Sequence, residues 1–180
     1  MFSTCPPVHL STCPLVRLST RSPFFLTFAH KPRHMTISEI ESQITSEFAM
    51  FDDWMDKYNY LIELGKSLPI VEEQYREDQY LISGCQSKVW LHAYMKDGLV
   101  YYHGDSDAII TKGIVNMLIR VLSGQLPEDI MNARLEFIDQ VGLKEHLSPT
   151  RSNGLGSMIR QMKLYATVFQ MKGAGTAGNQ

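Results

Sequence analysis

The feature that most constrains the fold is a short stretch in which the hydrophobic period is two residues. Apolar and polar residues alternate from Lys88 to Lys96 and again from Leu99 to Gly104, on either side of Asp97-Gly98. An Asp-Gly pair between two such stretches is typical of a tight β-hairpin turn, which also fixes the register of the two strands. We expect one face of this hairpin to join the hydrophobic core: Leu91, Ala93, Met95, Val100 and Tyr102.

The other face of the predicted hairpin carries aromatic rings and two histidines. Tyr94 lies opposite Tyr101 in the expected register, and His92 lies opposite His103. Imidazoles are common metal ligands, but two of them on a half-exposed aromatic face more often have no such role. We therefore predict that the protein has no metal site.

Two helices are predicted before the hairpin. Apolar residues recur at helical spacing after Thr36, and Thr36 and Glu39 match the pattern of a capping box, a common start of a helix. A second helix is expected over residues 52–67, and it must end before Pro69 because proline disfavours helical geometry in the preceding residue. The polar residues 72–78 are expected to form a loop that leads to the hairpin.

Further helices are predicted after the hairpin. The segment from Gly104 to Asp107 is expected to break the second strand and to cap a helix that ends at Gly124. Short helices are expected at Pro127 and Phe137, and a turn at residues 147–151 precedes a last helix from about residue 152. Helices on both sides of one compact hairpin indicate an α+β fold, with a small antiparallel β-sheet packed against several α-helices.

The first 34 residues differ in composition from the rest of the chain. They contain four basic residues and no acidic one, and the octapeptide STCPPVHL is followed directly by the near-duplicate STCPLVRL. We predict that this leader is disordered, because such a low-complexity segment cannot build a core. It resembles a transit peptide in composition, but we favour Met35 as the true start, since the capping box follows at once. The folded domain is then expected to span residues 35–172, with a flexible tail at residues 173–180.

Charge and hydropathy argue against two classes of partner. Residues 35–180 hold 13 basic and 19 acidic side chains, and the resulting net charge of −6 argues against nucleic acid as a partner. No apolar run is long enough to span a lipid bilayer, so we expect no membrane association. Cysteine usage is the more informative feature.

The predicted folded domain contains a single cysteine, Cys85. One cysteine cannot form an internal disulfide, a Cys-x-x-Cys pair or a zinc site made of cysteines alone. A buried inert thiol, one ligand of a mixed metal site and a nucleophile are the interpretations that remain. A reducing compartment is the default expectation for such a chain.

Cys85 lies in a polar loop, an unusual setting for a purely structural thiol. It follows Gly84, which gives the backbone freedom, and precedes Gln86 and Ser87. Lys88 is expected to favour the thiolate electrostatically. Counting back by twos along the strand, the sulfur should face the interior. From these residues alone, a small buried hydrophobe and a reactive thiol both remain open.

Three motifs together resemble the SufE family of sulfur-acceptor proteins. They are LISGCQSKVWL at residues 81–91, HGDSDAIITKGI at residues 103–114 and LSPTRSNGLGSMI at residues 147–159. The resemblance covers about residues 36–170. It implies a small antiparallel sheet packed by helices, a fold shared with iron–sulfur scaffold proteins of the IscU type.

The resemblance also implies a function for Cys85. Proteins of this family take sulfur from the persulfide of a SufS-type, PLP-dependent cysteine desulfurase, which they stimulate, and pass it to an iron–sulfur scaffold of the SufBCD type. The PLP belongs to the partner, so we expect no cofactor here beyond a transient cysteine persulfide. The protein is expected to be an accessory protein and not itself an enzyme, a monomer or weak dimer, and cytoplasmic in a bacterium. A plastid or mitochondrial location is the alternative if the leader is a transit peptide.

Other motif residues are expected to support the thiol. Gly84, Gln86 and Ser87 would shape the loop in its sheltered state. Asp105 and Asp107 are expected to cap the following helix, and contact with the desulfurase is the secondary interpretation. Arg151 opens the last helix, where a cation is unfavourable, so a contact with a partner carboxylate or with the Cys85 loop is the better interpretation.

Two other functions are considered. A Cys–His hydrolase would need a histidine beside Cys85 and an acid to orient it, and His92 and His103 are the candidates. An IscU-like metal or iron–sulfur scaffold would need more ligands than one cysteine supplies.

Overall fold

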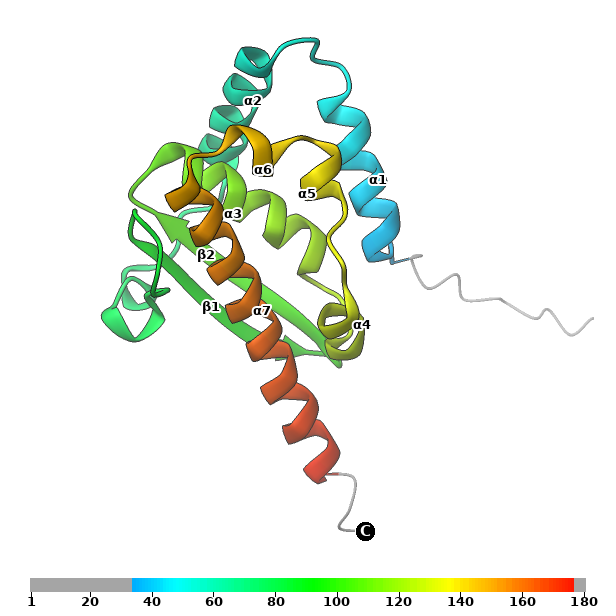
Figure 1. Ribbon diagram of the computed structural model, residues 1–180. Helices are drawn as coiled ribbons and strands as arrows, with labels where there is room; N and C mark the ends of the chain where they lie inside the picture. Colours follow the sequence, from blue (N-terminus) through cyan, green and yellow to red (C-terminus); the bar gives the residue numbers. More distant parts are fainter. Residues whose placement is uncertain (1–33, 177–180) are drawn as a thin grey trace, which may run out of the picture. The chain divides into compact units, whose positions relative to one another are not determined.

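The structure, a computed structural model, describes residues 34–176 (Figure 1). The predictions for the leader and for the end of the tail fall on residues 1–33 and 177–180, which lie outside the described residues. Within the described range, two α-helices precede a two-stranded antiparallel sheet and five follow it, so the fold is α+β, as predicted. No helix in this range is both long enough and apolar enough to cross a membrane.

The two helices before the sheet begin with the side-chain caps that the sequence provides. α1 (Ile37–Phe48) starts with a capping box, in which the Thr36 hydroxyl accepts from the Glu39 N–H at 3.3 Å and the Glu39 carboxylate accepts from the Thr36 N–H at 2.8 Å. Asp53 caps α2 (Trp54–Ser67) in the same way, by accepting from the Asp56 N–H at 2.9 Å. Both predicted helices are therefore confirmed, with starts set by local hydrogen bonds.

The hairpin has the predicted register. β1 (Val89–Lys96) pairs with β2 (Leu99–Ser106), and Leu91 lies opposite Gly104. Asp97 and Gly98 have φ angles of 52° and 79°, the left-handed pair of values that a two-residue hairpin turn requires. One predicted core residue is misplaced: Met95 is 39% exposed, and it lies in the pair of residues next but one to the turn, at the edge of the core.

The second strand is longer than predicted. β2 continues through Asp105 and Ser106, where the sequence indicated a break and a helix cap. The hairpin stays closed at this end because the Ser106 hydroxyl donates to the Lys88 carbonyl at 2.8 Å. α3 (Ile109–Leu122) therefore begins after Ala108, and its first turn has no side-chain cap.

Two helices cover the inner face of the sheet. α3 and the long helix α7 (Pro149–Thr176) lie across it (Figure 1). Tyr102 of β2 is 2% exposed, and its hydroxyl donates to the Met162 carbonyl of α7 at 2.8 Å. α2 packs on α3 from the outside, with Gly113 so close to Leu61 that a Cβ atom would lie 2.1 Å from the Leu61 carbonyl oxygen. The apolar residues at helical spacing in α3 are buried: Ile110, Ile114, Met117, Leu118, Val121 and Leu122.

Short elements connect these parts. Two 3₁₀ turns, Glu73–Tyr75 and Asp78–Tyr80, lie in and beside the loop predicted at residues 72–78. After α3 come α4 (Pro127–Asn132), α5 (Phe137–Gln140) and α6 (Leu143–His146). α7 starts three residues earlier than predicted, because Pro149 takes the first helical position, where its missing N–H costs nothing. The same helix continues to Thr176, into the segment for which the sequence predicts a flexible tail.

Candidate functional site

Cys85 lies in a short loop that leads into β1. The loop spans residues 83–88 and is closed at its base, where the Ile82 N–H donates to the Val89 carbonyl at 2.8 Å. Gly84 has a φ of +85°, a left-handed conformation that favours glycine. The chain therefore turns sharply just before the cysteine.

The thiol of Cys85 is half-buried against α7. Its Sγ donates a long hydrogen bond to the Gly154 carbonyl oxygen, at 3.6 Å. A Cβ atom at position 154 would lie 3.3 Å from that sulfur, so glycine in this turn of the helix lets the loop approach closely. The sulfur thus faces the interior, in agreement with the alternation along the strand.

Burial raises the pKa of the Cys85 thiol above its usual value. The sequence predicted the opposite direction, with Lys88 favouring the thiolate, and that prediction is wrong. The Lys88 side chain is exposed and does not offset the loss of water around the sulfur. In this arrangement of the loop the thiol is held in its protonated form.

The polar residues of the loop tie it to two helices. The Gln86 side-chain oxygen accepts a hydrogen bond from the Thr150 hydroxyl at the start of α7, at 2.9 Å. Ser87 Oγ and Thr111 Oγ1 of α3 are also 2.9 Å apart. These two bonds and the sulfur contact to Gly154 hold the loop between α3 and α7.

Asp107 fastens the end of the loop and does not cap the helix. Its Oδ1 accepts from the Lys88 N–H at 3.0 Å. The backbone N–H just before α3 has a different partner, because the Ala108 N–H donates to the Ser106 hydroxyl at 3.3 Å. The predicted capping role is therefore wrong for Asp107, since β2 extends farther than the sequence indicated and the carboxylate faces the loop.

Asp105 does not cap the helix either. It is 2% exposed, and its carboxylate accepts from Lys112 at 2.9 Å, from the Ser106 N–H at 2.8 Å and from Arg76. Burial alone would raise the pKa of Asp105, but the hydrogen bonds from Lys112, Ser106 and Arg76 together hold it below its usual value. Asp105 of β2 therefore links the chain between the two 3₁₀ turns to α3.

A cavity of about 340 Å³ opens beside the thiol. The residues predicted for the site that reach it are Cys85, Gln86, Ser87, Asp107 and Arg151, whereas Gly84 and Asp105 do not. The complete lining comes from the loop, from the start of α3 and from α7: Cys85, Gln86, Ser87, Asp107, Ala108, Thr111, Ile114, Arg151, Gly154 and Met158.

Arg151 lies in the first turn of α7 and lines the same cavity as Cys85. Its side chain is half-buried, and it makes no ion pair with the acidic residues of the described segment. The predicted proximity to the cysteine loop is therefore present. A cation at the start of a helix receives no help from the helix dipole, so a negatively charged group in the cavity would stabilise it.

Three residues that hold the cysteine loop were not predicted from the sequence. Thr111, Thr150 and Gly154 lie in the same motifs as the predicted residues, but each contacts the loop from a helix. One signal was present for Thr111, a polar residue within the otherwise apolar stripe of α3. Thr150 and Gly154 gave no such signal, because their contacts arise only when α7 packs beside the loop.

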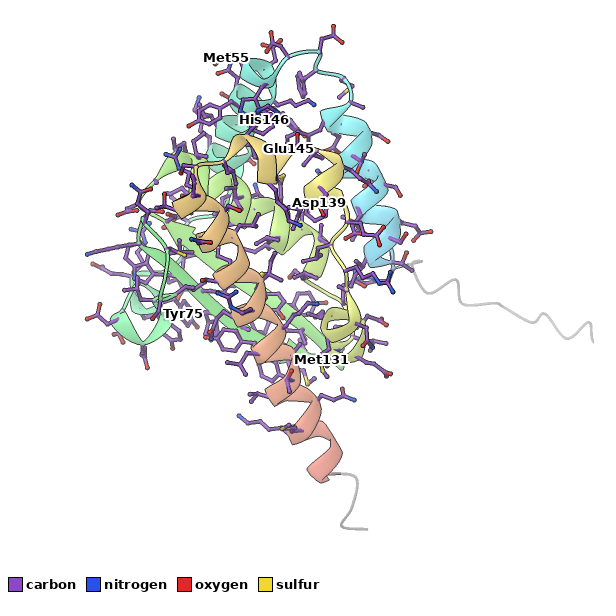
Figure 2. All side chains as sticks on the ribbon, viewed as in Figure 1. Met55, Tyr75, Met131, Asp139, Glu145 and His146 are labelled. Atoms are coloured by element: carbon purple, nitrogen blue, oxygen red, sulfur yellow. The ribbon has the colours of Figure 1, made fainter. Side chains whose placement is uncertain are left out.

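The histidines within residues 34–176 do not supply a base for Cys85, because none of them lines the cavity. His92 stacks on Tyr75 with ring centroids 4.2 Å apart, and Tyr80 packs edge-on against it at 5.4 Å. Tyr75, labelled in Figure 2, belongs to the segment that packs against the outer face of the hairpin. Burial, and then the neighbouring His103, lower the pKa of His92. The hydrolase alternative thus lacks its catalytic pair among these residues.

The scaffold alternative also lacks support from the geometry. Across the part of the chain that the structure describes, no three side chains of the types His, Cys, Asp and Glu are placed to hold a metal ion together. Asp107 is the one acidic residue in the lining of the Cys85 cavity. A cysteine and one carboxylate are fewer ligands than an iron–sulfur or zinc site uses.

A family model described as "SufE: Fe-S metabolism associated domain" matches residues 42–166, more than half of the chain. The chain belongs to the SufE family. The match includes the cysteine loop and most of α7, and therefore every residue that lines the cavity. The SufE family is associated with iron–sulfur metabolism, so the site described above lies in a protein of that process.

Individual SufE-like relatives agree with this assignment. An uncharacterized SufE-like protein of Rhizobium meliloti is 41% identical over 126 residues, which cover 67% of this chain and 90% of the relative. One from Rhizobium etli is 38% identical over 131 residues, 70% of this chain and 88% of the relative. The solution structure of a hypothetical protein from Thermus thermophilus has a TM-score of 0.60 at 20% identity, covering 71% of this chain and 93% of that one. This last likeness supports the α+β fold of the SufE-type domain.

Proposed function

We propose that this SufE-family protein accepts persulfide sulfur on Cys85 from a SufS-type cysteine desulfurase and passes it to an iron–sulfur scaffold of the SufBCD type. The observation that carries the proposal is the setting of the thiol. Among the described residues Cys85 is the only cysteine, and it borders a cavity in a loop held by hydrogen bonds to two helices. A carrier needs one thiol that can take up sulfur and be sheltered afterwards.

The transfer step is a thiol exchange. The Cys85 thiolate attacks the outer sulfur of the donor persulfide, a new S–S bond forms, and the old S–S bond breaks as the donor cysteine leaves as its thiolate. No oxidant is needed, because the sulfur moves with its oxidation state unchanged. A second cysteine nearby would attack the new persulfide and release the sulfur as hydrogen sulfide, so a lone cysteine suits the role.

The sheltered loop sets a condition on this step. Burial raises the pKa of the Cys85 thiol, and the sulfur is in contact with Gly154, so the resting thiol is a poor nucleophile. We propose that docking of the desulfurase displaces the loop from α7 and exposes the thiol to water and to the donor. Stimulation of the desulfurase then follows, because its own cysteine is freed for another turnover.

The experiment measures sulfur on the protein directly. The protein is incubated with a SufS-type desulfurase and free cysteine, and intact mass and peptide mapping are then recorded. We expect a gain of one or more sulfur atoms on Cys85, reversed by a reductant. Cys85→Ser is expected to fold, to gain no sulfur and to give no stimulation of desulfurase turnover. If the serine variant stimulates the desulfurase as well as the parent does, sulfur acceptance at Cys85 is not the mechanism, and an allosteric role takes its place.

A further inference from the structure

One wall of the Cys85 cavity consists of two hydroxyl groups. Ser87 Oγ and Thr111 Oγ1 are 2.9 Å apart, and both residues line the cavity. Thr111 is only 5% exposed, although the other buried residues of α3 are apolar or glycine. A polar side chain buried in such surroundings is expected to have hydrogen-bond partners for its donor and its acceptor groups.

The hydroxyl pair has one proton more than its hydrogen bond uses. Each hydroxyl can donate once, and the bond between Ser87 and Thr111 takes one of the two protons, whichever residue is the donor. A helical hydroxyl commonly donates to the carbonyl one turn earlier, as Thr167 does to Lys163 at 2.9 Å. Thr111 makes no such bond within residues 34–173, so the second proton is available to a group in the cavity.

We propose that the Ser87–Thr111 hydroxyl pair hydrogen-bonds the terminal sulfur of a Cys85 persulfide inside this cavity. The inference rests on the function proposed above and adds the group that receives the sulfur. A persulfide bond is about 2.0 Å long, so the added sulfur stays close to Sγ. The cavity volume of about 340 Å³ leaves ample room for one more sulfur atom.

The contact with Gly154 favours a position of the added sulfur near the hydroxyls. The Cys85 thiol now donates its proton to the Gly154 carbonyl of α7. A persulfide anion has no proton to donate there, and its negative charge is repelled by the carbonyl oxygen. The terminal sulfur is therefore best placed away from Gly154, facing the hydroxyl donors on the loop and on α3.

The formal charges at the cavity act in opposite directions. Arg151 on α7 favours an anion, whereas Asp107, between β2 and α3, disfavours one. Asp107 already accepts the Lys88 N–H with one of its oxygens, which keeps its carboxylate in place. These two charges act against each other, and the neutral hydroxyl donors supply the hydrogen bonds that a persulfide anion in the cavity needs.

The test loads sulfur without a desulfurase. Inorganic polysulfide serves as the donor: the Cys85 thiolate attacks one of its sulfur atoms, and the polysulfide leaves one sulfur shorter, so no oxidant is needed. Alkylation of the loaded protein by iodoacetamide is followed by mass spectrometry across a pH series, and the midpoint reports loss of the proton from the terminal sulfur. The double variant Ser87→Ala/Thr111→Val is expected to raise this midpoint by about one pH unit, because it removes a hydrogen bond to a charged group.

Matched variants separate this role from a merely structural one. Thr111→Ser keeps the hydroxyl and is expected to keep the parent midpoint, as is Thr167→Val, which removes a hydroxyl of α7 that does not line the cavity. Ser87→Ala and Thr111→Val alone each leave one donor and are expected to give smaller upward shifts, which serve as the test if the double variant does not fold. An unchanged midpoint in these variants overturns the proposal, as does a parent protein whose Cys85 polysulfide cannot load.

The outcomes also distinguish this inference from the proposed function. If polysulfide loading gives the expected shift but a desulfurase never loads Cys85, the sulfur-acceptor function fails and the hydroxyl site stands. If a desulfurase loads the parent and the double variant alike and their midpoints are equal, the function stands and the hydroxyl site fails.

Discussion

Asp105 is a charged residue that is almost fully buried. It is buried between Arg76, which lies between the two 3₁₀ turns, and Lys112 of α3. A buried charge is tolerated only when its partners are in place, and removal of one partner leaves the others unsatisfied. The local sequence does not reveal this, because Asp105 and Asp107 stand in the same Asp-Ser-Asp motif, and only the packing of distant segments makes one an ion-pair centre and the other a loop anchor.

We predict that Asp105→Asn lowers the free energy of unfolding at pH 7 by about 2 kcal/mol, since a hydrogen bond to a charged group contributes about 1.5–3 kcal/mol. The folded-state pKa of Asp105 is lowered, so its stabilisation is present above the unfolded pKa of about 3.9 and is lost as pH falls through the folded pKa. The difference between parent and variant should therefore shrink below about pH 4. Urea unfolding at several pH values measures it.

Asp139→Asn is the matched control for this series. Asp139, labelled in Figure 2, pairs with Lys144 at 2.7 Å, but both side chains are about 60% exposed. Exposed pairs contribute little, so this variant is expected to unfold like the parent at every pH. Equal unfolding curves for Asp105→Asn and Asp139→Asn would show that the buried network adds no stability.

Two of the helices contact neighbouring segments closely at a glycine residue. α2 crosses α3 at Gly113, where there is no room for a further side-chain atom, and α7 crosses the cysteine loop at Gly154, where a Cβ atom would be in tight contact with the Cys85 sulfur at 3.3 Å. The starts of α1 and α2 were predictable, because capping residues and apolar spacing are local, whereas the start of α3 was not, since β2 extends through the expected cap. These crossings were not predictable, since a glycine within a helix gives no indication of which element will lie against it.

We predict that Gly113→Ala destabilises the domain by more than about 2 kcal/mol, as overpacking at a rigid backbone contact does. The added Cβ would lie 2.1 Å from the Leu61 carbonyl oxygen, which can move only together with α2. This cost exceeds the roughly 1 kcal/mol that alanine gains over glycine in a helix. Thermal unfolding followed by circular dichroism measures the change.

Gly156→Ala provides the comparison on α7. Its nearest contact is the flexible end of Arg160, at 3.5 Å, so the same substitution meets no backbone there. We expect it to keep or raise the melting temperature, because only the helix propensity changes. If both alanine variants raise the melting temperature, the α2–α3 crossing has room for a Cβ atom at position 113, and the prediction fails.

For the whole molecule, the sequence was sufficient to predict the α+β class, the hairpin register and the inward orientation of the Cys85 sulfur. It was not sufficient for the electrostatics of the site. The direction of the Cys85 pKa depends on how deeply α7 buries the sulfur, and a neighbouring lysine in the sequence gives no measure of that burial. Likewise, the role of Arg151 depends on a cavity whose walls come from three separate segments.

Arg151 is expected to act in association with a partner more than in folding. Arg151→Ala should leave the melting temperature near that of the parent, because the side chain makes no ion pair with the other described residues. It should weaken stimulation of a SufS-type desulfurase about tenfold, the effect of losing one charge-assisted contact of about 1.4 kcal/mol. Lysine at position 151 should restore part of the stimulation. A large drop in stability with normal stimulation would contradict this assignment.

During synthesis the cysteine loop is made well before the helix that covers it. Two of its anchors, Thr150 and Gly154, come 64 and 69 residues after the groups they hold. At a synthesis rate of about 5–20 residues per second, the ribosome needs roughly 3–14 s to reach them. Throughout that interval the nascent thiol has no helix α7 to cover it. The sulfur of Cys85 is therefore made before the helix that buries it, and the thiol becomes sheltered only after the first turns of α7 have been synthesised.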